Sequence, residues 1–147
     1  MVAVDTNILV YAHRADSSWH ERALQVITEL AEGHSAWAIP WPCLWEFMAI
    51  ATHPRIYSPP SSLDDALIQV ERWLASPSLH LLSEGEAFFE TLQPIVLKSK
   101  VRGPAIHDAR IAAICLRHGV AKLLTADRDF SRFSQLRTEN PLFARKR

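Results

Sequence analysis

The chain lacks the features that mark several large classes of protein. It has only two cysteines, Cys43 and Cys115, only four glycines, and no run of about 18 apolar residues that could cross a membrane. Both cysteines lie in apolar helical patterns, so we interpret them as buried thiols in a reducing compartment. No His/Cys cluster has zinc-ligand spacing, and no signal peptide is predicted. We therefore expect a cytoplasmic protein that makes no membrane contact.

The chain also has no net charge, but its charges are unevenly distributed. The formal net charge is +0, yet residues 1–96 carry 4 basic and 12 acidic side chains, whereas residues 97–147 carry 12 basic and 4 acidic ones. Two interpretations stay open: the two halves pair in the fold, or the C-terminal half faces nucleic acid or another acidic partner.

Short apolar runs alternate with amphipathic stretches along the whole chain. Strands are predicted at residues 2–4, 36–39, 79–82 and 120–125. Helices are predicted at residues 7–13, from a cap at Ser17 or Ser18 to 32, and at 43–52, 63–75, 84–98 with a break or kink at Pro94, and 104–118. A short edge strand is expected near Leu136 or Leu142-Phe143, and residues 145–147 are expected to be disordered. The order predicts one α/β domain over residues 1–147 with a mostly parallel central sheet.

Four acids are placed where charged side chains are rare. Asp5 and Asp127 follow predicted strands, Asp108 lies near the start of a helix, and Glu46 lies about one turn into another helix. Because ligands bind beyond the carboxyl ends of parallel strands, all four side chains are expected to converge there. Converged carboxylates repel one another, and a hard divalent ion offsets that repulsion. Each acid also has a simpler interpretation, as a helix cap, a partner of the helix dipole or an exposed helical residue.

The chain resembles PIN-domain proteins, and more narrowly the VapC toxins of bacterial type II toxin–antitoxin modules. The resemblance lies in the opening Val2–Asn7, in the helical Glu46, in the segment His107–Ala113 and in the ending Leu124–Phe130. It covers essentially the whole chain, and the Thr-x-Asp-x-Asp-Phe ending makes it specific.

The resemblance implies a three-layer α/β/α sandwich and a Mg²⁺- or Mn²⁺-dependent endoribonuclease that acts as the toxin of a toxin–antitoxin pair. Its catalytic acids correspond to Asp5, Glu46, Asp108 and Asp127, and we expect Asp5, Asp108 and Asp127 to be the metal ligands. Asn7 and Thr125 correspond to supporting positions, and Asp129 is expected to assist or replace Asp127. The implied partners are an RNA substrate, a cognate antitoxin and a second copy of the chain.

Other residues suggest how RNA and the antitoxin could bind. Lys98, Lys100 and Arg102 form an alternating basic run that could contact RNA phosphates, or could simply be solvated. Trp41 and Trp45 lie one helical turn apart and could stack bases, although a place in the core or at a protein interface is favoured. By resemblance, the helices around residues 9–13 and 41–48 are expected to line an antitoxin groove.

Two other functions compete with the ribonuclease hypothesis. A catalytically weak PIN-like module could bind RNA or protein without cleaving it, although the complete set of acids argues against this. A phosphatase with an aspartyl nucleophile usually needs a second Asp two residues on, and Asn7 occupies that position.

Overall fold

The central element of the computed structural model, which describes residues 1–143, is a five-stranded parallel sheet. Its strands are β1 (Val2–Val4), β2 (Trp37–Pro40), β3 (Leu79–Leu82), β4 (Lys122–Leu124) and β5 (Thr138–Glu139). They lie in the order β3-β2-β1-β4-β5, and every neighbouring pair is parallel. The predicted parallel α/β class is confirmed. The stretch 145–147, for which disorder was predicted, lies outside the described residues.

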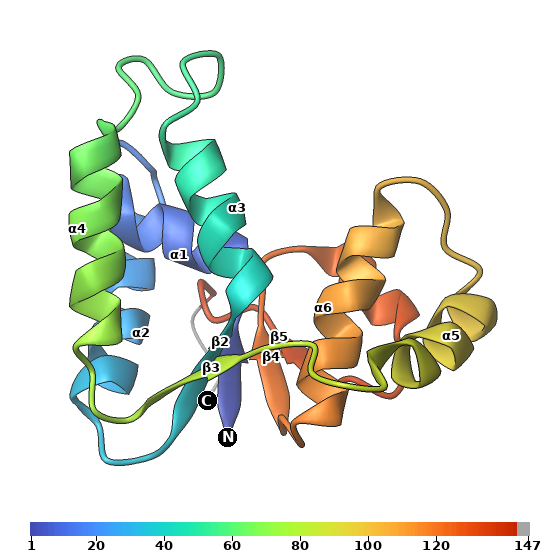
Figure 1. The fold of residues 1–147 in the computed structure, drawn as a ribbon. Helices are drawn as coiled ribbons and strands as arrows, with labels where there is room; N and C mark the ends of the chain where they lie inside the picture. Colours follow the sequence, from blue (N-terminus) through green and yellow to red (C-terminus); the bar gives the residue numbers. More distant parts are fainter. Residues whose placement is uncertain (144–147) are drawn as a thin grey trace.

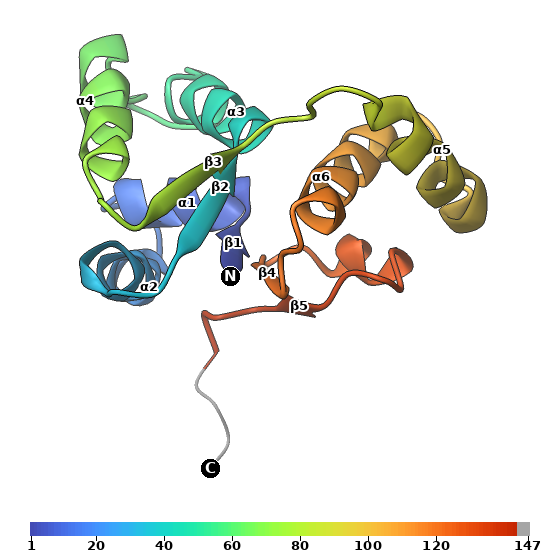
Figure 2. The ribbon, with the colours of Figure 1, turned by 60° about the horizontal axis from the view of Figure 1, so that its bottom comes forward.

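Helices cover both faces of this sheet. They are α1 (Thr6–His13), α2 (His20–Glu32), α3 (Trp41–Ala51), α4 (Leu63–Leu74), α5 (Phe88–Ser99), α6 (Ala105–Arg117) and the short 3₁₀ helix η1 (Arg128–Arg132). Figures 1 and 2 show α1 to α4 gathered on one side of the sheet and α5 and α6 on the other. The arrangement is the expected three-layer α/β/α sandwich.

The central strands are buried on both faces, which explains why their sequences are apolar runs instead of alternating patterns. Trp37, Ile39 and Leu123 are fully buried. On the α1–α4 side, the Phe47 ring of α3 packs edge-on against His13 and Trp73, with centroid distances of 5.1 and 4.7 Å. Among residues 1–143, no helix is long and apolar enough to span a bilayer.

Two helices begin later than the sequence pattern predicts. The predicted cap at Ser17 or Ser18 is wrong, because α2 begins at His20 and its N-cap residue Trp19 makes no side-chain cap. Helix α5 begins at Phe88 instead of residue 84, because Gly85 and Ala87 have φ values of 69° and 57°, which an α-helix excludes. The same helix runs without a break through Pro94.

The strand order places a topological switch point between β1 and β4. From β1 the chain moves outward through β2 to β3, and the crossover through α5 and α6 then returns it to the other side of β1. The Asp5 amide, just beyond β1, donates to the Leu124 carbonyl at the end of β4 at 2.9 Å. In open parallel sheets, ligand sites form beyond the carboxyl ends of the strands at such a point.

Candidate active site

Asp5 both caps a helix and lines the cleft beyond the sheet. Its Oδ1 accepts from the Thr6 amide at 2.8 Å, so it is the N-cap of α1 as the simpler interpretation predicted. Its side chain is almost fully buried, with 5% of the residue exposed. Burial is the main cause that raises the pKa of Asp5 from 3.8 to about 6, and the nearby charge of Glu46 adds to it. Hydrogen bonds from Thr125 and Thr6 lower this pKa and offset only part of the shift.

The Thr125 hydroxyl joins the ends of the two central strands. It donates to Asp5 Oδ2 at 2.7 Å and accepts from Asn7 Nδ2 at 3.3 Å and from the Asp127 amide at 3.0 Å. The amide group of Asn7 also reaches Asp5 Oδ2 at 3.3 Å, and its Oδ1 accepts from the Ala126 amide at 3.1 Å. Asn7 and Thr125 therefore contact the predicted site, as expected of supporting residues.

Glu46 reaches the cleft from α3. Its Oε2 accepts from the Thr6 hydroxyl at 2.9 Å. Pro42 and Ile50, one turn before and one turn after it, line the same cleft. The neighbouring stripe of this helix carries Trp41 and Trp45, which stack with a centroid distance of 5.2 Å and an interplanar angle of 19°. Trp45 remains 55% exposed, so it does not belong to the core.

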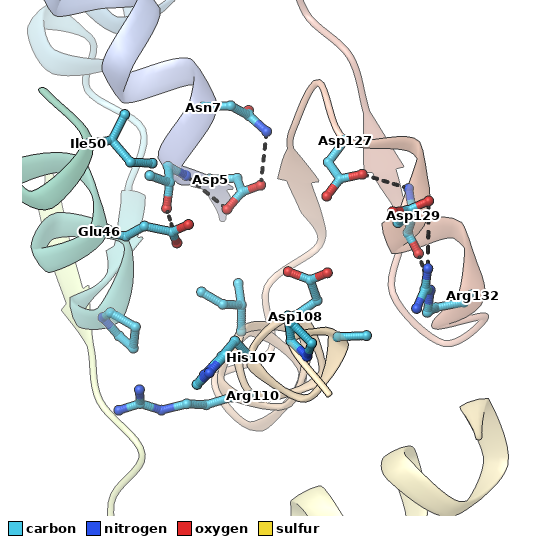
Figure 3. Close-up of a pocket in the computed structure, with 15 residues that line it drawn as sticks. Asp5, Asn7, Glu46, Ile50, His107, Asp108, Arg110, Asp127, Asp129 and Arg132 are labelled. Carbon is cyan, nitrogen blue, oxygen red and sulfur yellow. Dashed lines mark hydrogen bonds and ion pairs between the residues drawn. The ribbon is translucent and has the colours of Figure 1, made fainter. Parts of the chain in front are cut away.

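Asp108 and Asp127 line the side of the cleft opposite Glu46, as Figure 3 shows. Asp108 lies in the first turn of α6 and is half-buried. Desolvation raises its pKa first, and the charges of Asp127 and Glu46 raise it further, whereas Arg132 opposes the shift. Asp127 caps η1, since its Oδ1 accepts from the Asp129 amide at 2.8 Å.

The four predicted acids line one open cleft of about 620 Å³, as Figure 3 shows. Two arginines also line it, but each is paired with another carboxylate: Arg110 with Glu84 and Arg132 with Asp129. Among the ion pairs of residues 1–143, none includes any of the four acids. The cleft therefore gathers negative charge that no described basic side chain neutralises by direct contact.

The chemistry of these oxygen donors suits a hard divalent cation. Within residues 1–143, however, no three His, Cys, Asp or Glu side chains are arranged to hold one ion together. A small, strongly hydrated ion such as Mg²⁺ fits nonetheless, because it keeps several waters and needs only one or two protein carboxylates besides substrate phosphates. The assignment of Asp5, Asp108 and Asp127 as ligands stays a prediction.

The basic run proposed for RNA contact lies away from these acids. Lys98 lies near the end of α5, and Lys100 and Arg102 lie between α5 and α6; all three are exposed, and none lines the cleft. The cleft instead contains Arg132, which the sequence analysis did not single out. Its only sequence signal is its position three residues after Asp129, which places both residues in the η1 turn.

Comparison with known proteins identifies the family. The sequence matches the PIN domain family over residues 2–136. The chain is a VapC-type member of the PIN domain family. It is 35% identical to ribonuclease VapC43 of Mycobacterium tuberculosis over 142 residues, which cover 97% of this chain and 96% of that protein. Ribonuclease VapC48 of the same organism is 26% identical over 137 residues, covering 93% and 94% of the two chains.

Solved structures of similar proteins share the fold of this VapC-type chain. The VapC20 toxin of Mycobacterium tuberculosis superposes with a TM-score of 0.66 at 16% identity, covering 89% of this chain and 93% of VapC20. A chain of the Rickettsia felis VapBC2 assembly, solved with a promoter DNA fragment, gives a TM-score of 0.67 at 17% identity, covering 95% and 98%. At these identities the likeness establishes the fold.

The buried charge of Asp5 predicts a pH-dependent difference between the wild-type protein and Asp5→Asn. The pKa is about 6 in the folded state and near 3.8 in the unfolded state, so between these values the unfolded state binds fewer protons. The wild-type free energy of unfolding should therefore fall, relative to Asp5→Asn, by up to about 3 kcal/mol as the pH rises from about 4 to above 6. Urea unfolding in EDTA measures this difference, and parallel pH profiles would contradict it.

The Thr125 hydroxyl can be tested with a pair of variants. Thr125→Val keeps the shape but removes one donor to Asp5 and leaves the Asp127 amide without its acceptor, so it should cost about 2 kcal/mol of stability. Thr125→Ser keeps the hydroxyl and is expected to cost less. Urea unfolding at neutral pH measures both; a Thr125→Val variant as stable as the wild type would show that the hydroxyl does not contribute.

Proposed function

We propose that the protein is a Mg²⁺- or Mn²⁺-dependent endoribonuclease and the toxin of a toxin–antitoxin pair. The observation that carries the proposal is the meeting of Asp5, Glu46, Asp108 and Asp127, from four separate elements, in one cleft. None of the four forms an ion pair with a basic side chain of residues 1–143. The names of its relatives support it: VapC43 and VapC48 are named ribonucleases, and VapC20 is described as a toxin that cleaves the sarcin–ricin loop.

Asp5, Asp108 and Asp127 are the residues proposed to hold the metal together with its bound waters. A bound divalent ion supplies Lewis acidity, lowers the pKa of water and orients phosphate oxygens. The protein keeps two of these carboxylates in place with neutral contacts: Thr125 and Thr6 hold Asp5, and the Asp129 amide holds Asp127. Because these contacts are neutral, the negative charge of the carboxylates stays available to a cation.

The proposed reaction is in-line attack of water on an RNA phosphodiester, giving 5′-phosphate and 3′-hydroxyl ends. We assign to Glu46 the role of accepting the proton of that water. Its Oε2 is held by the Thr6 hydroxyl, whereas its Oε1 accepts no hydrogen bond within residues 1–143. The raised pKa values of Asp5 and Asp108 set a lower limit on the working pH, because both must ionise to bind a cation.

The competing hypothesis, a PIN-like module that binds without cleaving, does not explain these features. A binding module has no need to bury a carboxylate among neutral donors at the cost of a raised pKa. Cleavage by the purified protein separates the two hypotheses.

Asp108→Asn is expected to abolish divalent-dependent cleavage, because it removes a carboxylate from the cleft. The fold should stay intact, since the Asp108 side chain makes no hydrogen bond or ion pair with other side chains of residues 1–143. The assay is incubation of total bacterial RNA with protein and Mg²⁺ or Mn²⁺, followed by mapping of the new 5′-phosphate ends. Asp64→Asn, which changes an exposed acid in the first turn of α4, is the matched control and should keep full activity. EDTA should stop the wild-type reaction, and full activity of Asp108→Asn would refute the assigned site.

An antitoxin and a second copy of the chain are the proposed protein partners. The VapBC2 assembly and FitAB, solved with DNA, are structural neighbours that support a partner of this kind. The expected groove draws little from α1, since Leu9, Val10 and Ala12 are buried in the core. The exposed apolar surface comes from α3, where Trp45 is open to solvent.

Expression of the chain alone is expected to arrest bacterial growth, and co-expression of the small reading frame adjoining its gene should restore it. A tagged toxin should then copurify with that product, and Asp108→Asn should be harmless alone yet still copurify. If Asp108→Asn arrests growth as strongly as the wild type does, the toxicity does not depend on the acids of the cleft.

A further inference from the structure

Arg132 is the residue of the acid cleft whose role neither the family resemblance nor the sequence pattern assigns. It lies at the end of η1, the turn that Asp127 caps, and lines the cleft together with Asp5, Asp108 and Asp127. Its Nε donates to the Asp129 carbonyl at 2.9 Å, and its Nη2 lies 3.6 Å from Asp129 Oδ1. Figure 3 shows the Arg132 guanidinium next to Asp129.

These contacts hold the guanidinium and leave its outer edge available. Only Nε makes a hydrogen bond within residues 1–143, and the contact of Nη2 with Asp129 is longer than a hydrogen bond. An arginine anchored in this way presents two terminal amino groups in the fork geometry that matches two oxygens of a phosphate. Because the η1 turn already restrains the Arg132 side chain, less conformational entropy is lost when a phosphate binds.

The negative charge of the cleft makes a phosphate-binding arginine useful there. A phosphodiester that approaches Asp5, Glu46, Asp108 and Asp127 is repelled by their carboxylates, so a cationic side chain near the reacting position favours its entry. The other arginine of the cleft, Arg110, is paired with Glu84, which does not line the cleft. Arg132 is paired with a residue of its own turn and lies beside the acids themselves.

We propose that Arg132 binds the non-bridging oxygens of an RNA phosphate at the cleft, and that Asp129 positions Arg132. The proposal rests on the ribonuclease function proposed above and adds a substrate contact to it. It also changes the expected role of Asp129: its amide supports Asp127, while its carbonyl and carboxylate both face Arg132. The η1 turn thereby couples an acid of the site to the group that holds the substrate.

The salt dependence of RNA binding tests this contact independently of catalysis. Binding of a labelled RNA carrying the mapped cleavage site is measured in the inactive Asp108→Asn background over a range of salt concentrations. Adding Arg132→Gln should lower the slope of log K against log salt by about 0.7, the value for one phosphate contact on single-stranded RNA. In the otherwise wild-type protein, Arg132→Gln should reduce kcat/KM roughly 10- to 100-fold, as expected for the loss of a charged hydrogen bond.

Three further variants separate phosphate binding from effects of net charge or of the turn. Arg55→Gln removes the same charge from an exposed position outside the cleft and should leave slope and kcat/KM unchanged. Arg132→Lys keeps the charge but not the fork, so it should keep the slope and recover kcat/KM only in part. Asp129→Asn should lower kcat/KM less than Arg132→Gln does. Thermal unfolding midpoints of all variants check that the fold is intact.

The outcomes distinguish the two proposals. If wild-type protein cleaves RNA and Arg132→Gln alters neither slope nor kcat/KM, or alters them no more than Arg55→Gln, the Arg132 proposal is overturned and the ribonuclease function stands. If wild-type protein neither cleaves nor binds RNA, both are overturned. A loss in Arg132→Gln with a matching fall in thermal stability and an unchanged slope would assign Arg132 to the turn alone.

Discussion

The Asp5 carboxylate is buried without an ion-pair partner among residues 1–143, and the rest of the site depends on this constraint. Thr6 and Thr125 supply neutral hydrogen bonds, which lower its pKa but do not cancel the cost of burial. A cation bound beside Asp5 would lower the cost of ionising this buried carboxyl group. The Thr125 hydrogen bond, with the Asp5 amide and the Asn7 side chain, also ties the end of β1 to the end of β4. One hydroxyl therefore contributes both to the sheet edge and to the electrostatics of the cleft.

Structural and functional roles coincide in this site. Asp5 caps α1 and Asp127 caps η1, as the simpler interpretations predicted, and both line the cleft as well. This is a consequence of the parallel sheet, because helices that follow its strands begin at the carboxyl edge, where the ligand site also lies. A capping residue at that edge is already directed toward the ligand. The capping role of an acid at such a position therefore does not argue against a catalytic role.

Much of the fold follows from local pattern. The apolar runs at residues 2–4 and 79–82 are strands with the predicted bounds, and α4 begins at the predicted residue 63. Where the prediction was wrong, the cause is a backbone conformation that the pattern of side chains does not reveal. Helix α5 starts late because Gly85 and Ala87 adopt positive φ. In the site, the run from Lys98 to Arg102 looked suitable by charge, yet its place between α5 and α6 keeps it out of the cleft. Arg132 escaped notice because an arginine in a turn has no distinguishing local pattern.

The sequence by itself determined which acids follow strands or begin helices, because hydrophobic periodicity and chain order are local properties. It thereby determined the parallel α/β class and four of the acids that share the cleft. Only the tertiary structure decided how they are held: that Thr125 bonds to a residue 120 positions away and that Thr6 holds Glu46. It also decided that Arg132, paired with Asp129, lines the same cleft. Hydrogen-bond geometry and desolvation depend on packing between distant segments, which no local pattern encodes.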